Sequence, residues 1–389
     1  MPGSPFNGRS MRVTGCEILR LRLPFRSAFR HAAAERDASD TVLVVLEDES
    51  GHRGFGEILA RRYVTGESSE AIFATGAPQL GAGVVGREFE TQEALVAFLL
   101  DQLAAEQWPP ALFGGFEAAL INLFEQAAMW DMSAVLGPRR VSQPGNCFTI
   151  GLEASEQLRL RAREARLAGA TVVKVKVGGE HGEDDVARLR LLNECWKGTM
   201  PLRLDANGSL SVDEASALLA GCAALPLESL EQPFPAEEPD LADKLREVHT
   251  RSGVPLVADE SVCRLSDARR WAGVGAYQYF NVRVGKCGGL LGSSQIMATA
   301  RASGIRLVGG SMVGESAVLR HGSELLLGHT DDLPYVEGLA QNRALLACEP
   351  VNVVYNEAFT NGSRHGPTAV FSENEEARHR FLVGFRRVP

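Results

Sequence analysis

Two lysines and three carboxylates stand at nearly even intervals in the middle of this chain. Lys174 and Lys176 lie in one apolar run, and the next three apolar runs each close on an acid, namely Asp205, Glu231 and Asp259. The intervals match one strand–helix unit, because the crossover between parallel strands is usually a helix. Because each of these groups stands at the same position within its strand–helix unit, all of them are expected at the carboxyl ends of neighbouring strands. In a closed α/β barrel those ends form the rim where catalysis occurs.

The three acids have the chemistry of a metal site. Carboxylate oxygens are hard donors of the class that Mg²⁺ selects, and three of them would leave positions open for water and a substrate oxygen. The alternative is that each acid caps the helix after its strand, but three acids in phase beside Lys-x-Lys favour the metal. Glu260, next to Asp259, is expected to point to the opposite side of its strand. Asn207 either shapes the rim by hydrogen bonding or forms a turn.

The two lysines have the chemistry of a base. They are two residues apart on a strand and therefore face the same side. Two ammonium groups beside each other and beside a metal ion disfavour each other's protonation, and desolvation adds to this effect. A lysine whose pKa is lowered in this way can act as a general base near neutral pH. The alternative for a lone Lys-x-Lys is a solvated pair on an edge strand.

From about residue 146 the sequence alternates regularly between apolar and helical segments. The apolar runs predict strands at 147–152, 171–177, 201–205, 227–231, 255–259, 279–284, 306–309 and 335–338. The segments between them predict helices near 154–169, 183–197, 211–224, 238–251, 264–273, 288–303 and 314–328. This order favours an α/β fold with a TIM-like (β/α)₇β barrel over an open doubly wound sheet.

The parts of the chain on either side of the barrel have a different sequence pattern. In the N-terminal part, strands at 12–24 and 40–47, a turn at 48–51 and a further segment at 54–58 predict an antiparallel arrangement, which helices at 88–106 and 115–136 follow. The last part is expected to hold irregular and short extended segments that pack back on the N-terminal region. The expected organisation is a disordered leader over 1–10, an N-terminal domain over 11–140, the barrel over 141–340 and a C-terminal segment over 341–389.

Composition argues against several classes of partner. The net charge is −9 and no run of Lys or Arg occurs, so nucleic acids and anionic membrane surfaces are poor partners. No apolar stretch approaches membrane-spanning length. The seven cysteines are scattered without C-x-x-C spacing, which argues against a disulfide framework or a zinc site and predicts a cytoplasmic location.

Short motifs around the chemical residues carry a family resemblance. They are Lys-x-Lys at 174–176, Asp205 in Asp-Ala-Asn, Glu231 in Glu-Gln-Pro, Asp259 in Ala-Asp-Glu-Ser, and Lys286 in Lys-Cys-Gly-Gly. Over almost the whole chain the sequence resembles the enolase superfamily and, more narrowly, its muconate lactonizing enzyme subgroup, which includes dipeptide epimerases and o-succinylbenzoate synthases. The resemblance implies an α+β capping domain, built from the N-terminal region and the C-terminal tail, whose loops close over the substrate.

The resemblance also implies roles for the residues that match its motifs. Asp205, Glu231 and Asp259 would bind Mg²⁺, for which Mn²⁺ can substitute. Lys176 would be the base that abstracts a proton, and Lys174 would assist it electrostatically.

The sixth barrel strand departs from the subgroup's pattern. The subgroup has a second catalytic lysine there, in a segment resembling Asn-Ile-Lys-x-x-Lys-x-Gly-Gly, and this chain has Arg283 at the matching position. Arginine stays protonated and is a poor base, but it can serve as a fixed cation or a carboxylate clamp. A structural role for Arg283 is the alternative. Lys286 is structural by the resemblance, and it could replace the missing lysine only if its loop were rearranged.

Positions near the last two barrel strands bear on the substrate. Dipeptide epimerases carry a pattern resembling Asp-x-Asp at the eighth strand, which binds the substrate's ammonium group, whereas this chain offers only Glu337 there. This difference argues against a dipeptide substrate. Glu315 lies near the rim by its spacing, where it would either touch the substrate or stand at a helix N-terminus.

The sequence therefore predicts a Mg²⁺-dependent enzyme that removes the α-proton of a small carboxylate substrate to give an enediolate. We favour an isomerase of the cycloisomerase or racemase/epimerase type over a lyase that eliminates a β-leaving group with one base. A non-catalytic carboxylate-binding relative is the alternative of another class, against which the intact Lys176 and the complete set of acids argue. Substrate choice is expected to lie in loops near 25–37 and 60–68, and the protein is expected to form a homo-oligomer.

Overall fold

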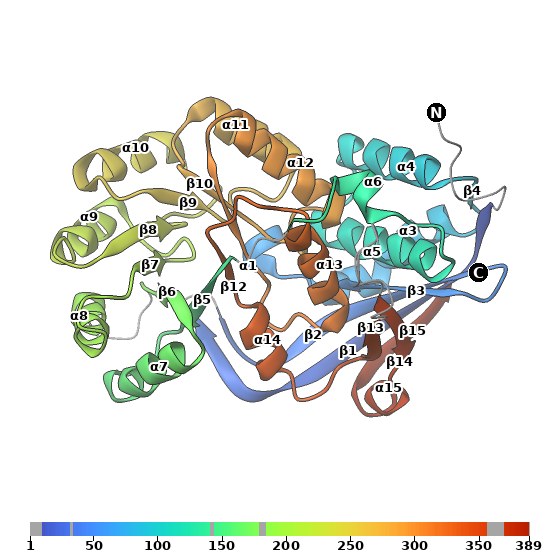
Figure 1. Ribbon diagram of the computed structural model, residues 1–389, viewed down its shortest axis with the longest axis horizontal. Coiled ribbons are helices and arrows are strands. Elements are labelled where there is room, and N and C mark those ends of the chain that lie inside the picture. The colour runs from blue at the N-terminus through green and yellow to red at the C-terminus, as the bar shows by residue number, and fades with distance from the viewer. Residues whose placement is uncertain (1–9, 32–33, 141–143, 179–183, 356–368, 389) are drawn as a thin grey trace.

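The structure, a computed structural model, describes residues 10–31, 34–140, 144–178, 184–355 and 369–388. The predicted leader lies outside the described residues except for Ser10. The described chain forms a closed barrel and, beside it, an antiparallel sheet with its own helices (Figure 1). Both parts of the predicted fold, an α/β barrel and an α+β cap, are therefore present.

The cap sheet combines strands from both ends of the chain. Its order is β15-β1-β2-β3, with β4 paired to β1. Its strands are β1 (Met11–His31), β2 (Ala34–Asp48), β3 (Arg53–Ile58), β4 (Glu88–Phe89) and β15 (Leu382–Val388). The predicted turn after β2 is formed by Asp48, whose Oδ1 accepts the backbone N–H groups of Ser50 and His52 at 2.9 and 2.8 Å.

Both faces of the sheet are buried along the middle of β1 and β2. Alternate residues of these strands, such as Ile18 and Val44, belong to the main core of the molecule. The residues between them, such as Leu19 and Val45, pack in a second cluster with the C-terminal segment. Strands that are covered on both sides require continuous apolar runs, which explains the β-branched and leucine run at residues 41–46 of β2.

The cap helices differ from the prediction at their boundaries. They are α1 (Arg62–Thr65), α2 (Ser69–Ala71), the π-helical turn η1 (Ile72–Gly76), α3 (Ala77–Val84), α4 (Gln92–Ala105), α5 (Pro110–Gln126) and α6 (Met132–Leu136). The helix predicted over 88–106 begins only at Gln92, because residues 88–89 pair with β1. The single helix predicted over 115–136 is wrong. The chain breaks after Gln126, where Ala128 takes a left-handed φ of 56° that no α-helix contains.

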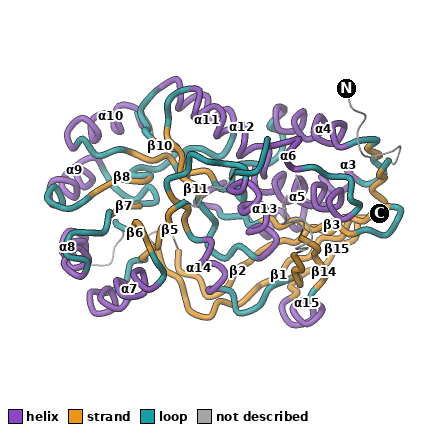
Figure 2. Tube along the Cα trace, viewed as in Figure 1, coloured by secondary structure: helices purple, strands orange, loops and turns teal. Residues whose placement is uncertain are grey.

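The barrel closes as predicted, in the order β10-β11-β12-β5-β6-β7-β8-β9. Its strands are β5 (Gly145–Ile150), β6 (Ala170–Lys176), β7 (Leu202–Asp205), β8 (Leu227–Glu231), β9 (Leu256–Ala258), β10 (Tyr279–Val282), β11 (Arg306–Gly309) and β12 (Tyr335–Glu337). The helices between them are α7 (Ser155–Leu167), α8 (Asp185–Cys195), α9 (Val212–Gly221), α10 (Leu241–Ser252), α11 (Leu265–Val274), α12 (Gly289–Ala302) and α13 (Ala317–Gly328). They alternate with the strands around the ring (Figure 2). Among the described residues, no helix combines the length and apolar character that crossing a membrane requires.

The C-terminal segment contains more regular structure than predicted. It holds helices α14 (Leu339–Leu345) and α15 (Glu375–Phe381) as well as a small sheet of β13 (Val351–Tyr355) and β14 (Ala369–Glu373). Asn374 caps α15 by accepting the backbone N–H of Ala377. Short helices of this kind give little periodic signal, so the sequence pattern did not reveal them.

Two buried carboxylates of the cap hold the N-termini of barrel helices. Glu117 of α5 accepts the backbone N–H groups of Leu290 and Leu291, at 2.5 and 2.7 Å, at the start of α12. Glu57 of β3 accepts from Ser316 and Leu319 at the start of α13. The first N–H groups of a helix have no partner within the helix, and these carboxyl oxygens accept them, so the contacts join the cap to the barrel beside β10 and β11.

Candidate active site

Lys176 and the three predicted metal ligands meet at the carboxyl ends of consecutive barrel strands. The strand register pairs Lys176 with Asp205, and Asp205 with Glu231. Asp259 follows β9, the next strand of the barrel, and all four side chains are buried. The equal phase seen in the sequence is therefore present in the barrel.

Lys176 is held by two hydrogen bonds of 2.6 Å, which Nζ donates to Asp205 Oδ2 and Asn207 Oδ1. Asn207 has a left-handed φ of 45°, a conformation that asparagine tolerates. Its Nδ2 also donates to Glu260 Oε1 at 3.0 Å. Asn207 therefore combines the two roles considered for it, since it forms the turn after β7 and orients the lysine at the rim.

Glu260 lies closer to the site than strand alternation predicts. The expectation that it points away is wrong, because β9 ends at Ala258 and the alternation stops there. Burial, together with the nearby charges of Asp259 and Asp205, raises the pKa of Glu260 to about 8.

Lys174 lies deeper in the barrel and contacts three carboxylates. Nζ donates to Glu337 Oε2 at 2.6 Å and to Glu231 Oε1 at 3.2 Å, and it lies 3.2 Å from Asp205 Oδ2. Burial lowers the pKa of Lys174, but Glu231 and Asp205 outweigh burial, so the pKa is raised. Without a metal ion beside it, Lys174 thus does not show the lowered pKa that the sequence predicts for the lysine pair next to a metal ion.

Arg283 follows β10 and reaches two of the predicted metal ligands. Its Nη2 donates to Asp259 Oδ2 and, at 3.3 Å, to Glu231 Oε1. Burial lowers the pKa of Arg283, yet Asp259 and Glu231 raise it further, so the net pKa lies above its usual range and the guanidinium stays charged. In return, burial raises the pKa of Asp259, but Arg283 and Lys286 outweigh burial and hold it low.

Lys286 anchors the loop that carries Asp259. Its Nζ donates to the carbonyl oxygens of Asp259 and Val262, at 2.7 and 2.6 Å, and the residue is fully buried. These bonds hold the amine against the backbone and away from the position of a second base.

Glu315 and Glu337 are each bound by other groups of the protein. Glu315 Oε1 accepts the backbone N–H of Met312 at 2.5 Å, and the residue lines neither of the two large cavities of the rim. Glu337 ends β12 and is committed to Lys174 and to Arg203. Its carboxylate is thus engaged by cations of the protein itself.

Three polar residues in the layer below the rim were not identified from the sequence. Arg203 Nη2 donates to Glu231 Oε2 and Asn281 Nδ2 donates to Glu231 Oε1, both at 2.9 Å, while Ser229 accepts from Arg203 Nε at 3.1 Å. Each of them stands two residues before a rim residue, so strand alternation places its side chain on the same inner face. Polar residues two positions before a rim residue are thus the sequence signal that identifies all three.

The acid set fits a divalent cation by the type of its donor atoms and by its place at one end of the barrel. Asp205 and Glu231 end consecutive strands, Asp259 follows the next one, and its buried Oδ1, 3.4 Å from Lys286 Nζ, accepts no hydrogen bond from the described residues. The side chains as they stand, however, do not form a coordination site. Within the described residues, no group of three or more His, Cys, Asp or Glu side chains is placed to hold a metal ion. The cause is that side-chain cations lie between the acids.

Two cavities open beside the Lys176–Asn207 contact. One has a volume of about 440 Å³ and is lined by Lys174, Lys176, Arg283 and Glu337, with Ser27 on the cap side. The other has a volume of about 500 Å³ and runs from Asn207 and Glu260 to the cap residues 62–66. Both cavities therefore reach the loops in which substrate choice is expected to lie.

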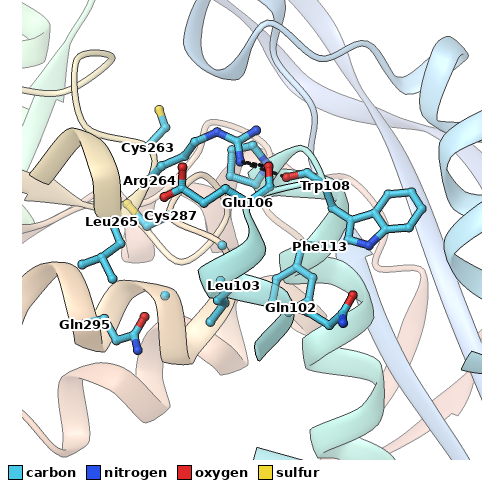
Figure 3. A pocket seen from close by; sticks show the side chains of 13 residues that line it. Gln102, Leu103, Glu106, Trp108, Phe113, Cys263, Arg264, Leu265, Cys287 and Gln295 are labelled. Carbon is cyan, nitrogen blue, oxygen red and sulfur yellow. Dashed lines mark hydrogen bonds between the residues drawn. The ribbon is translucent and has the colours of Figure 1, made fainter. Parts of the chain in front are cut away.

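A third cavity lies at the junction of cap and barrel. Figure 3 shows Arg264 reaching across it to the carbonyl oxygens of Glu106 and Trp108, each at 3.1 Å. Its volume of about 30 Å³ suits water rather than a substrate. This cavity is thus part of the interface between the cap and the barrel.

A barrel with a cap and with carboxylates at its rim is typical of enzymes of the enolase type. Comparisons with known proteins agree with this class. Residues 157–350 match the family model described as Enolase C-terminal domain-like. The chain is 31% identical over 303 residues to the L-Lys-D/L-Arg epimerase of Methylococcus capsulatus, covering 78% of this chain and 83% of that protein.

Two solved structures show the same fold. The first is the dipeptide epimerase of Cytophaga hutchinsonii complexed with Mg and D-Ala-L-Val, with a TM-score of 0.82, 22% identity and coverage of 97% of this chain and 100% of that one. The second is the muconate lactonizing enzyme of Pseudomonas fluorescens complexed with muconolactone, with a TM-score of 0.83, 20% identity and coverage of 96% and 99%. The chain belongs to the enolase superfamily, in the muconate lactonizing enzyme subgroup, and is an enzyme of its isomerase type.

Proposed function

We propose that this protein is a divalent-metal-dependent isomerase that removes the α-proton of a carboxylate substrate to give an enediolate. The observation that carries the proposal is the placement of Lys176. Its amine is fixed by Asp205 and Asn207 on the wall of a 440 Å³ cavity that a small acid can enter. A base must lie within hydrogen-bond reach of the proton it removes, and a fixed amine beside a substrate-sized cavity meets that requirement.

Lys176 takes the proton in this mechanism and, where the reaction requires, returns it. Lys174 keeps positive charge below the site, because its pKa is raised by Glu231 and Asp205. Negative charge that gathers on the substrate oxygens during proton removal is thus met by a fixed ammonium group.

Arg283 faces the same cavity from the end of β10 and holds a permanent positive charge. It can bind the substrate carboxylate but cannot accept a proton, so we propose chemistry with one base on one face of the substrate. Glu337 is engaged by Lys174 and Arg203, which also argues against its binding a substrate ammonium group.

Asp205, Glu231 and Asp259 are the residues that would hold the divalent cation, for which we propose Mg²⁺ with Mn²⁺ as a substitute. When bound, such an ion would offset the charge of the substrate carboxylate and so make its α-proton more acidic. The solved dipeptide epimerase of C. hutchinsonii is complexed with Mg, which supports this assignment.

A second candidate is epimerisation of a dipeptide, which the 31% identical L-Lys-D/L-Arg epimerase favours, or racemisation of an N-acyl amino acid, which the similarity to an N-succinyl-L-Arg/Lys racemase favours. It needs a proton acceptor on each face of the substrate, and Arg283 stands where the second one is expected. A lyase with one base would use the same residues as the proposed isomerase.

Proton NMR in D₂O with Mg²⁺ and a panel of carboxylic acids separates these reactions. An isomerase of the cycloisomerase type forms a structural isomer and exchanges the α-proton, one of the epimerase type yields both epimers, and a lyase releases an unsaturated acid. Absence of exchange and of product over a panel that includes muconates, dipeptides and N-acyl amino acids would contradict the proposal.

A further inference from the structure

Every predicted metal ligand is already paired with a cation of the protein. Asp205 Oδ2 accepts from Lys176 at 2.6 Å. Glu231 Oε1 accepts from Lys174 at 3.2 Å and from Arg283 at 3.3 Å. Asp259 Oδ2 accepts from Arg283, whose guanidinium therefore bridges two of the three acids.

Cations already outnumber acids among the buried charges of the site without a divalent ion. Its buried acids are Asp205, Glu231, Asp259 and Glu337, and its buried cations are Lys174, Lys176, Arg203, Arg283 and Lys286. Among the described residues the cations thus exceed the acids by one. An added divalent cation would increase this excess of positive charge in a region of low dielectric, where such an excess is costly.

Arg283 is a cation of this set whose two carboxylate partners are both predicted metal ligands, Glu231 and Asp259. Lys286 is tied to two backbone carbonyls and Lys174 to Glu337. By contrast, Nε of Arg283 makes no hydrogen bond among the described residues, and the side chain lines the 440 Å³ cavity. Its present position depends on the glycine at 310, since a Cβ there would lie 2.9 Å from both Cγ and Nε of Arg283.

We propose that the Arg283 guanidinium is an internal counterion which occupies the gap between Glu231 and Asp259 and competes with the divalent cation for it. This inference rests on the metal-dependent function proposed above and deepens it. Binding of the ion moves the guanidinium into the cavity, where it becomes the partner of the substrate carboxylate. The anionic substrate in turn supplies the negative charge that the ion-loaded site lacks.

Ion and substrate therefore assist each other's binding. By linkage, the factor by which a carboxylate substrate tightens ion binding equals the factor by which the ion tightens substrate binding. The ion alone binds weakly, because it must first displace the guanidinium from its two carboxylate partners.

Binding of Mn²⁺ alone, followed by electron paramagnetic resonance on the full chain, tests the inference without any turnover. Wild type is compared with Arg283→Met, Arg283→Lys and the control Arg301→Met, which removes a partly exposed arginine paired with Asp332 outside the site. We expect Arg283→Met to bind Mn²⁺ at least about tenfold more tightly than wild type. Arg283→Lys, which keeps the charge, should show a smaller gain, and Arg301→Met should show none.

Thermal unfolding supplies a second readout. Arg283→Met should melt below wild type in EDTA, since two buried carboxylates lose their counterion, and should gain more from added Mn²⁺ than wild type does. If Arg283→Met folds only in the presence of Mn²⁺, the inference is likewise supported.

The outcomes separate this inference from the proposed function. Equal Mn²⁺ affinity in wild type and Arg283→Met, or weaker binding in the variant, overturns the inference and leaves the metal-dependent function standing. If neither protein binds Mn²⁺, or if Asp205→Asn does not weaken the binding, both the inference and the metal-dependent function are overturned.

Discussion

Lys174 and Glu337 form a 2.6 Å contact between β6 and β12, two barrel strands that β5 separates. Both side chains are buried, and each has a further partner of opposite charge, Glu231 for the lysine and Arg203 for the acid. The pair therefore forms part of a charged layer inside the barrel, directly below the residues proposed to react.

Removing the Lys174 amine should destabilise the fold as well as the site. Lys174→Met leaves Glu337 and Glu231 short of positive charge, and breaking a buried pair costs about 3–5 kcal/mol. The free energy of unfolding, measured by urea titration, should fall by that amount. Lys244→Met is the matched control, because Lys244 is one-third exposed and its pair with Glu238 contributes about 0–1 kcal/mol. A loss in Lys174→Met no larger than in the control would contradict the buried network.

Lys176→Met should abolish α-proton exchange while leaving the fold intact. The side chain keeps its bulk and loses the amine that we propose as base, a loss worth roughly 10²–10⁴ in rate. The measurement is exchange in D₂O by NMR with the first active acid of the panel, with the circular dichroism spectrum as the control for folding. Exchange at the wild-type rate would assign the base to another residue.

Removal of divalent ions should stop the reaction. EDTA should abolish turnover and α-proton exchange, and Mg²⁺ or Mn²⁺ should restore both in wild type. Asp205→Asn should lower activity by a comparable amount and should not recover at ordinary ion concentrations, because one carboxylate ligand has gone. Full activity in EDTA after exhaustive dialysis would refute metal dependence.

Arg283 should restrict deuterium to one face of the substrate. A permanent guanidinium supplies no proton acceptor, so label from D₂O should enter a single stereoisomer of substrate or product. Arg283→Met should lower turnover by a factor that corresponds to roughly 2.7–4 kcal/mol, as for other preorganised donors. Equal labelling of both stereoisomers by the wild-type enzyme would establish a second base.

Glu117 should make part of the stability depend on pH. Burial outweighs its two backbone hydrogen bonds and raises the pKa of Glu117 from 4.5 to about 8. The folded state then binds more protons than the unfolded state between these values, so stability is highest at low pH within this window and falls as pH rises towards 8. Glu117→Gln cannot ionise, and its free energy of unfolding should vary less than that of wild type between pH 5 and pH 8. Identical pH profiles for the two proteins would exclude this role.

The barrel could be predicted from the sequence because its signals are local and repeated. Each strand is a short apolar run, and three of these runs end in an acid at the same position of the strand–helix unit. Counting the residues between the acids therefore predicts that they meet at the rim. The boundaries of α5 and α6 could not be predicted in this way. The left-handed Ala128 that separates them has no residue-type signature, since alanine rarely adopts that conformation.

The electrostatics of the site were less predictable than its location. The sequence places Lys174 beside Lys176, and the expected consequence was a lowered pKa. Instead, Glu231 and Asp205 raise the pKa of Lys174. The structure also adds a contact with Glu337, from a strand more than 160 residues away, which no local sequence pattern predicts. Arg203 and Asn281 belong to the same layer, and they were not predicted because, apart from Lys174, only residues at the strand ends were considered.

The pairing of β15 with β1 has a consequence for the growing chain during translation. Strand β1 emerges from the ribosome early, but the strand that covers its edge is made only after the whole barrel. Until then β1 exposes an unpaired row of backbone groups, a template to which other chains can add. We expect nascent chains that are stalled within the barrel to depend on chaperones, and the edge to be sealed only when residues 382–388 arrive.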